Sequence, residues 1–309
     1  MNRKLDTEFL EDLQRGKLVE LARKIRRDDT LMLALRGKSI NVYYRGGSIL
    51  RLEQKGTDYL AHFDANYAMD EIMPNVPRVV SAPEHCSDWV KALPQLKEFM
   101  NAFLSEHAKS EREFQQLVAW ENNRSPISNS TEYFITDIEY ADVSQSARLD
   151  MLGLRWLSHS RKDGSACTPV FIEMKYGIDA YDGDAGIIAH IDDLKAILGD
   201  PVRLEALSET IADQFNQLAL LDLISFNRSK TIEKISVSGR PEVVFLLANH
   251  NPRSRKLLNI LESVDEPRNF DLRFFTAAFA GYGMHRKCMM TLDQFRRQLE
   301  VAAATDTSN

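Results

Sequence analysis

The sequence has few cysteines and no long apolar run. Its three cysteines, Cys86, Cys167 and Cys288, are widely spaced and form no Cys-x-x-Cys pair. A disulfide framework or a cysteine-ligated zinc site is therefore not expected. The longest apolar runs, such as 243–248 and 274–280, are far shorter than the roughly 20 residues that a membrane helix needs. Residues 1–12 are charged and lack the apolar region of a signal peptide. We therefore expect a reduced, cytoplasmic protein with no membrane partner.

A strong basic excess is also missing. The chain has 39 Lys and Arg against 45 Asp and Glu, for a formal net charge of -6. This balance excludes a uniformly basic nucleic-acid binder but not a local basic surface. Between residues 250 and 297, nine Lys and Arg stand against five Asp and Glu. The candidate contacts to a nucleic-acid backbone in this window are Arg253, Arg255, Lys256, Arg286 and Lys287.

Familiar nucleotide and metal signatures are absent as well. The sequence contains no Gly-x(4)-Gly-Lys-Ser/Thr loop, no Gly-x-Gly-x-x-Gly after a strand and no His-Glu-x-x-His. Its seven histidines have no close metal-ligand spacing, so surface or capping roles are expected for them. The loop at 178–186 is rich in Asp and Gly but lacks the final glutamate of an EF-hand, and we interpret it as a solvated loop.

The composition is that of an ordinary globular protein, and the length of the chain suggests two domains. The 309 residues are 44% apolar and 27% charged, which is typical of a soluble domain that buries a sizeable core. Helical spacing of leucines predicts a helix over 10–25. A β-meander then follows over 40–45, 48–52 and 59–63, with Gly46-Gly47 as the first turn. Residues 1–80 are thus predicted to form an N-terminal accessory module, followed by a second domain over 81–301 and a disordered tail over 302–309.

The second domain alternates between helices and strands. Apolar periodicity predicts helices over 87–105, 110–122, 190–198, 203–226 and 254–262 and a last helix starting near 291. Strands are predicted over 133–140, 147–157, 169–176, 243–248 and 272–279. The fold class is therefore α/β, with a mixed sheet flanked by helices behind a helix-plus-meander module.

The predicted strand over 169–176 contains two charges in an otherwise apolar setting. Its sequence Val-Phe-Ile-Glu-Met-Lys-Tyr places Glu173 and Lys175 on one face, because side chains alternate along a strand. The preceding strand carries a single acid, Asp150. If the hairpin closes between Arg161 and Lys162, Asp150 and Glu173 each lie 11 residues from the closing pair and face each other. Closure at 163–164 would shift this pairing.

Two opposed carboxylates beside an ammonium suit one kind of chemistry. The carboxylates would repel each other at neutral pH unless a divalent cation lay between them, and Mg²⁺ or Mn²⁺ prefers such oxygen ligands. A bound metal ion lowers the pKa of its water and neutralises the charge that develops during phosphodiester hydrolysis. Lys175 could orient the water, help to deprotonate it or bind the scissile phosphate. The alternative is a purely structural one, in which Glu173 and Lys175 form an ion pair on the surface of an edge strand.

Asp150 followed by Glu173-Met174-Lys175, in a strand-turn-strand context, resembles the motif of the PD-(D/E)XK nuclease superfamily. The resemblance covers roughly residues 107–250. It implies a restriction-endonuclease-like core: a helix, an antiparallel three-stranded meander, further helices and another strand. The residue before the aspartate is Leu149 and not the proline of the family's pattern.

The resemblance implies further site residues and a function. Family members often carry a glutamate on the first core helix, for which Glu111 is the candidate and Glu113 the runner-up; Glu139, Gln214 and Gln217 could line the site. For the two glutamines, an exposed position on the helix surface is the alternative interpretation. The function implied is a Mg²⁺- or Mn²⁺-dependent nuclease acting on DNA, in defence against foreign DNA or in repair, where cutting both strands would suit a homodimer. The alternatives are a non-catalytic nucleic-acid-binding or protein-interaction module on the same fold, and an RNA-directed nuclease.

Overall fold

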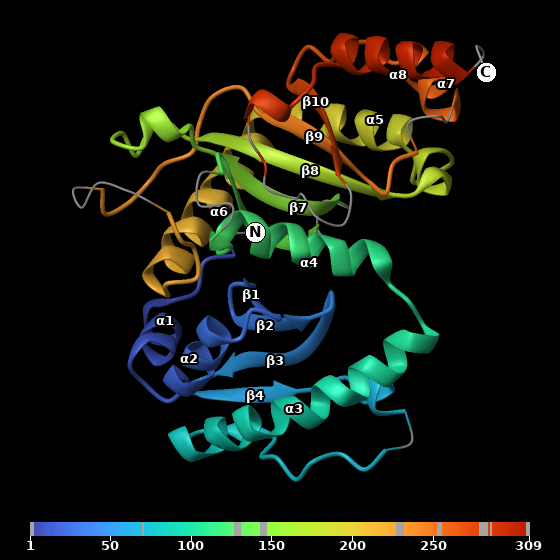
Figure 1. Cartoon of the computed structure of the whole chain (residues 1–309). Coiled ribbons are helices and arrows are strands. Elements are labelled where there is room, and N and C mark those ends of the chain that lie inside the picture. The colour runs from blue at the N-terminus through green and yellow to red at the C-terminus, as the bar shows by residue number, and fades with distance from the viewer. Residues whose placement is uncertain are drawn as a thin grey trace. The chain divides into compact units, whose positions relative to one another are not determined.

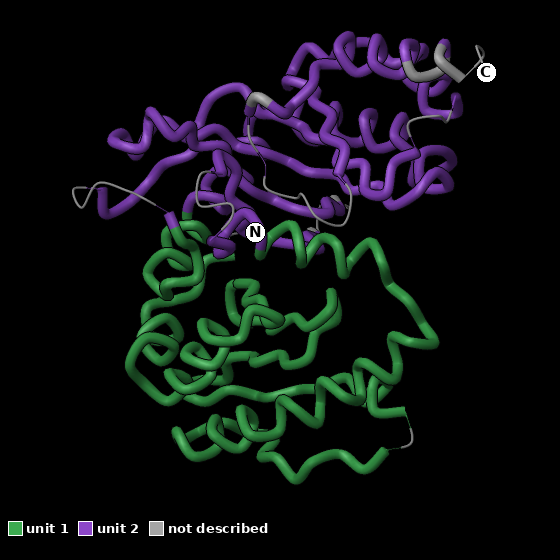
Figure 2. The backbone as a smooth tube through the Cα atoms, viewed as in Figure 1, with its two compact units in different colours: residues 1–120, 213–225 green, residues 121–212, 226–309 purple. Residues whose placement is uncertain are grey.

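A computed structural model describes residues 3–69, 71–126, 131–142, 147–226, 232–251, 255–277, 284 and 286–306. The chain divides into two compact units (Figure 2). Residues 1–120 and 213–225 form unit 1, and residues 121–212 and 226–309 form unit 2. The boundary expected near residue 80 therefore lies inside unit 1. The reason is that helix α3 (Pro83–Glu106) packs on α2 (Val19–Arg27) and β3 (Gly47–Lys55) of the N-terminal region, which buries its apolar face there.

Unit 1 is built on an antiparallel sheet with the order β1-β2-β3-β4-β5 (Figure 1). Besides β3, its strands are β1 (Leu31–Leu35), β2 (Ser39–Tyr44), β4 (Asp58–His62) and β5 (Val79–Val80). The meander of β2, β3 and β4 confirms the prediction. The single helix expected over 10–25 is instead two helices, α1 (Thr7–Gln14) and α2. They part near Gly16, where an added Cβ would lie 2.1 Å from Asp12 Oδ1.

The first hairpin turn lies one residue earlier than predicted. Its two central residues are Arg45 and Gly46, with φ values of 49° and 73°, because a tight hairpin needs two left-handed residues in succession. Gly47 already begins β3. A Cβ on Gly46 would lie 2.4 Å from the backbone of Arg112 in helix α4 (Ser110–Asn123). Gln116 of α4 accepts the Gly46 N–H at 2.7 Å, which fixes the turn against that helix.

Unit 2 contains a mixed sheet with the order β10-β9-β8-β7-β6 (Figure 1). The strands are β6 (Tyr133–Asp142), β7 (Ala147–Arg155), β8 (Thr168–Tyr176), β9 (Glu242–Ala248) and β10 (Asp271–Ala277). The first three form an antiparallel meander, whereas β9 and β10 run parallel to β8 and to each other. All seven residues of β9 are buried, as expected for a strand covered on both faces. An α/β fold with a mixed sheet is thus confirmed.

The helices of unit 2 follow the predicted order. They are α5 (Ile187–Leu198), α6 (Pro201–Leu220, whose last residues belong to unit 1), α7 (Arg255–Glu262) and α8 (Leu292–Asp306). Helix α8 packs on the sheet through Phe295, which stacks on Phe274 at a centroid distance of 5.1 Å; Phe274 stacks in turn on Phe245. The disorder expected from residue 302 is wrong as far as Asp306, since α8 continues to that residue, and residues 307–309 lie outside the described part. Among the described residues, no helix has the length and apolarity to cross a membrane.

Gly153 of β7 allows β6 and β7 to approach each other closely. A Cβ at this position would lie 2.4 Å from the carbonyl oxygen of Phe134, and a backbone atom cannot move away as a side chain can. We expect Gly153→Ala to lower the free energy of unfolding by about 1–3 kcal/mol, the usual cost of overpacking. Urea titration followed by circular dichroism measures this change. Ala102→Gly, on the exposed surface of α3, serves as the comparison. It should lower the free energy of unfolding by about 1 kcal/mol, the cost of glycine within a helix. Gly56→Ala is unsuitable because the φ of Gly56 is 64°.

Candidate functional site

The three motif residues lie on neighbouring strands of the unit 2 sheet. Asp150 is on β7, and Glu173 and Lys175 are on β8. Met151 of β7 pairs with Ile172 of β8, which is the register of a hairpin that closes between residues 161 and 162. The next position of that register places Asp150 opposite Glu173. The register is thus the one that the alignment of the two acids requires, and the opposition of their side chains stays a prediction.

Asp150 binds the neighbouring strand at the point where the ladder stops. Pairing of β7 with β8 ends at Met151 and Ile172, while β8 remains paired with β9 as far as Tyr176. The Asp150 carboxylate accepts the backbone N–H of Met174 through Oδ2 at 2.8 Å. The side chain thus accepts the hydrogen bond that a backbone carbonyl of β7 would accept if the pairing continued. This bond holds the carboxylate where β7 and β8 separate.

Glu173 is a buried carboxylate with an incomplete set of hydrogen bonds. Its exposed fraction is 1%, and its Oε2 atom has no hydrogen-bond partner among the described residues. The His190 ring on α5 lies against it, with Nδ1 at 2.7 Å from Oε2. Because a buried carboxylate is costly without compensation, this oxygen is suited to a cation.

Lys175 is buried on the same face of β8. Its exposed fraction is 4%, and its Nζ donates a hydrogen bond to the carbonyl oxygen of Ala185 at 2.9 Å. Ala185 lies in the loop that leads from β8 to α5. Both charged residues of β8 are therefore in contact with the segment from Ala185 to His190, which covers this part of the sheet. The alternative of an exposed pair at a sheet edge is wrong, since both residues are buried and β9 pairs with β8.

Glu139 is on β6, the strand next to Asp150 of β7. It stands between the residues of β6 that pair with Met151 and Leu149, so it lies opposite Asp150. Its φ is 52°, a left-handed conformation that costs a non-glycine residue of order 1–3 kcal/mol and tends to occur at functional sites. Glu139 and Asp150 are thus flanked by paired residues of β6 and β7, and the place of Glu139 in the site stays a prediction.

Two of the other predicted site residues are on α4 in unit 1. Glu113 forms an ion pair with Arg45 of the hairpin turn, with the Nε to Oε1 distance at 2.6 Å and Nη2 to Oε2 at 3.3 Å. This pair gives Glu113 a structural role within unit 1. Glu111 lies in the first turn of the same helix and is half-buried; its place in the site stays a prediction.

The two glutamines of α6 are buried and not on the exposed helix surface. Their exposed fractions are 0% for Gln214 and 5% for Gln217. Gln214 donates to the carbonyl oxygen of Leu35 at 3.1 Å. Gln217 accepts the Leu5 N–H at 2.9 Å and donates to the Leu5 carbonyl at 2.8 Å. These contacts attach the end of α6 to the N-terminal region of unit 1. The interpretation as exposed surface residues is therefore wrong.

Much of the predicted basic surface is used inside unit 2. Arg273 and Arg286 pair with acidic groups of the sheet, and Arg296 donates through Nε to the carbonyl of Leu261 at the end of α7. Arg253 and the side chain of Lys287 lie outside the described residues. Of the five predicted contacts, Arg255 is exposed and Lys256 is half-buried at the start of α7.

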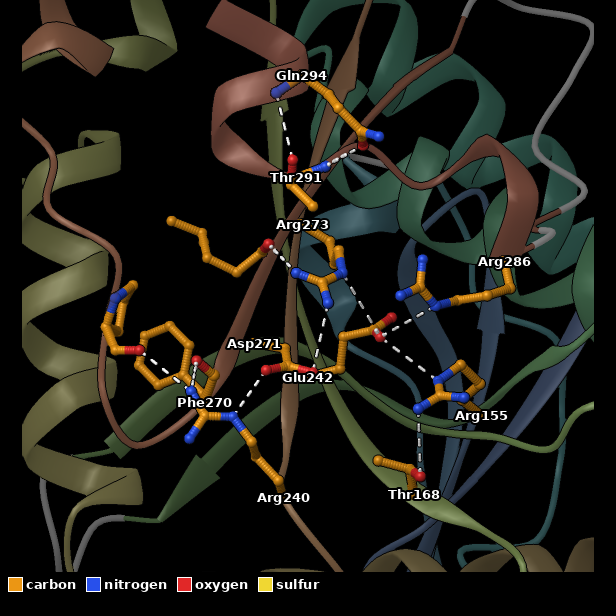
Figure 3. A network of polar contacts seen from close by, with 12 residues as sticks. Arg155, Thr168, Arg240, Glu242, Phe270, Asp271, Arg273, Arg286, Thr291 and Gln294 are labelled. Atoms are coloured by element: carbon orange, nitrogen blue, oxygen red, sulfur yellow. Dashed lines mark hydrogen bonds and ion pairs between the residues drawn. The ribbon is translucent and has the colours of Figure 1, made fainter.

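The Arg286 contact belongs to a network around a second buried acid, Glu242 (Figure 3). Glu242 is 1% exposed, and its Oε2 lies 3.4 Å from Nε of Arg155, 4.0 Å from Nε of Arg273 and 3.9 Å from Nε of Arg286. Tyr133 donates its hydroxyl proton to the same carboxylate. Burial and the negative charge of Glu242 raise the pKa of Tyr133 well above its usual value.

The Glu242 network and the motif residues lie on opposite faces of the sheet. Glu242 pairs with Val170 of β8, which is an odd number of residues from Glu173, so the two carboxylates point away from each other. Sequence reasoning did not identify this network. A lone glutamate at the start of the apolar strand β9 was the available signal.

Two further residues near the motif were missed from the sequence. His190 falls three residues after Ile187 and four before Leu194, so it lies on the apolar face of α5. Asp137 of β6 is fully buried and pairs with Leu152, which puts it on the face of Asp150. A polar residue on an apolar helix face, or an acid at a buried strand position, is the signal that could have found them.

The donor set fits a divalent metal ion that takes only part of its ligands from protein. Within the described part of the chain, no three His, Cys, Asp or Glu side chains are grouped closely enough to hold an ion as they stand. Mg²⁺ and similar ions are commonly bound by one or two carboxylates, with waters and substrate phosphates as the remaining ligands. The Oε2 of Glu173, which accepts no hydrogen bond from the described residues, and the Asp150 carboxylate on the adjoining strand match that pattern.

Comparisons of the chain with protein-family models, with curated proteins and with solved structures found no match.

Proposed function

We propose that this protein is a divalent-metal-dependent nuclease that hydrolyses phosphodiester bonds, with DNA as its substrate. The observation that carries the proposal is that Asp150 and Glu173 stand one position beyond Met151 and Ile172, the last paired residues of β7 and β8. Buried Lys175 lies on the same face as Glu173. An acid pair and an ammonium on one buried face are costly for the fold alone. They are useful where a metal ion and a phosphate must be bound together.

The order of elements from α4 to β9 supports the same proposal. Helix α4 is followed by the antiparallel strands β6, β7 and β8, then by helices α5 and α6, and then by β9 parallel to β8. This is the order of elements that the resemblance to the PD-(D/E)XK superfamily implies. In such a core the acids of the meander and the lysine of its third strand act together.

Each residue has a role that its position permits. Asp150 and Glu173 would hold Mg²⁺ or Mn²⁺, which supplies a water of lowered pKa and positive charge beside the phosphate. In the reaction a water oxygen bonds to phosphorus, the bond to one ester oxygen breaks, and the leaving oxygen takes up a proton. Lys175 would place its ammonium beside a phosphate oxygen or the attacking water, after exchanging its bond to the carbonyl of Ala185. Glu139 would help to order the water.

Two cations at the start of α7, one exposed and one half-buried, offer a surface for the DNA backbone. Arg255 and Lys256 stand at the start of this helix, in a chain whose formal net charge is -6. Binding that depends on a few local cations weakens as salt rises, because counterions compete for the phosphates. A role in defence against foreign DNA, or in DNA repair, would use such an activity.

A panel of substrates tests the proposed reaction. Purified protein is incubated with duplex DNA, single-stranded DNA and RNA of one sequence, each with Mg²⁺, with Mn²⁺ and with EDTA. We expect DNA cleavage with either metal ion and none with EDTA, because the acids need the cation to be functional. Cleavage confined to RNA would make the protein an RNA-directed nuclease. Binding of nucleic acid without cleavage of any substrate would indicate a non-catalytic binding module.

A further inference from the structure

His190 is placed where a ligand of the proposed metal ion would be. It lies in the first turns of α5, and its side chain is 23% exposed. The neighbouring residues on that helix face, Ile187, Ile191 and Leu194, are buried. An imidazole among these apolar residues is directed at the sheet, where it meets Glu173.

The contact between His190 and Glu173 is close but is not a hydrogen bond. Nδ1 lies 2.7 Å from Oε2, yet Oε2 has no hydrogen-bond partner among the described residues. A ring nitrogen and a carboxylate oxygen this close without hydrogen-bond geometry have the separation that two donors to a common cation would have. Neighbouring ligands at about 2.1 Å from a six-coordinate ion are about 3 Å apart.

We propose that His190 is a ligand of the metal ion, together with Glu173 and Asp150, and that the ion is a divalent transition metal such as Mn²⁺ in preference to Mg²⁺. This inference rests on the proposed function and adds a nitrogen donor to its two carboxylates. Mg²⁺ is a hard ion that prefers oxygen ligands, whereas imidazole suits transition metals. The Asp150 carboxylate would turn from its bond to the Met174 N–H or bridge both partners.

A second role for the same contact predicts the opposite effect on metal binding. If His190 were only a cationic partner of Glu173, it would compete with a metal ion for Oε2. Removing the imidazole would then raise the affinity for Mn²⁺. If His190 is a ligand, its removal lowers that affinity. The direction of the change therefore distinguishes the two roles without any measurement of cleavage.

Electron paramagnetic resonance of bound Mn²⁺ tests the proposal directly. We expect the spin-echo signal of the wild-type complex to show modulation from a directly bound ¹⁴N nucleus, and His190→Gln to lose it. We also expect His190→Gln to weaken Mn²⁺ binding by about 10–100-fold, with a smaller change for Mg²⁺. His159→Gln, which alters an exposed histidine of unit 2, should leave both the modulation and the affinity unchanged.

The outcomes separate this inference from the proposed function. Mn²⁺ that binds to the wild type without nitrogen modulation, or binds more tightly to His190→Gln, overturns the ligand role and leaves the nuclease proposal intact. Absence of Mn²⁺ and Mg²⁺ binding to the wild type overturns both. Circular dichroism of His190→Gln verifies that a loss of binding does not come from unfolding.

Discussion

Lys175→Met is expected to slow cleavage by a factor on the order of 10²–10⁴ while leaving metal binding intact. Methionine keeps the length and apolar stem of the side chain but removes the ammonium, which is buried on the face of Glu173. The loss of a positioned charge or proton-transfer group at a phosphate costs about this much in rate. Single-turnover cleavage of a labelled duplex measures the rate, and a metal titration measures the binding.

Lys195→Met is the matched control for this substitution. Lys195 is a partly exposed lysine of α5 that pairs with Asp192 at 3.0 Å, so its replacement removes the same charge from the same unit. Its cleavage rate should remain within about twofold of wild type, because Lys195 forms an exposed ion pair with Asp192 and not a buried contact beside Glu173. Equal rates for Lys175→Met and wild type would remove Lys175 from the site.

Glu242→Gln is expected to lower the free energy of unfolding by about 3–5 kcal/mol. The carboxylate is 1% exposed and lies within 4.0 Å of Arg155, Arg273 and Arg286. Glutamine keeps the shape but leaves these guanidinium groups without their shared negative charge, and breaking a buried ion cluster on one side costs about this amount. Urea unfolding followed by tryptophan fluorescence measures the change.

Asp192→Asn provides the comparison, because it removes an acid from an exposed ion pair. The Asp192 side chain is 65% exposed, and such pairs contribute ~0–1 kcal/mol. The metal affinity of Glu242→Gln should remain that of wild type where the protein is folded, because Glu242 faces away from Glu173. An unfolding free energy within 1 kcal/mol of wild type would show that the arginines do not depend on Glu242.

Local patterns in the sequence were sufficient to predict most of unit 2. Strand β9 was recognisable from its continuous apolar run, and the observed register of β7 and β8 is one of the two that the hairpin sequence allowed. Such predictions succeed because a one-residue slip would turn every side chain to the wrong face. The register of β7 and β8 therefore determines where Asp150 and Glu173 lie relative to each other.

Features that depend on distant parts of the chain could not be predicted in this way. His190 meets Glu173 only because α5 packs over β8, and no spacing rule connects them. Gln217 reaches Leu5 across more than 200 residues, so its burial was not visible from the helix alone. The division into units was missed because α3 packs backward on the N-terminal sheet and not forward along the chain.

The central claim is that Asp150 and Glu173 support metal-dependent cleavage of a phosphodiester. The most direct measurement is cleavage of duplex DNA in Mn²⁺ by wild type and by Asp150→Asn, purified identically and compared by circular dichroism. We expect cleavage by wild type that stops when EDTA is added and returns with excess Mn²⁺, and a rate at least ~10³-fold lower for folded Asp150→Asn. Cleavage by Asp150→Asn at the wild-type rate would contradict it.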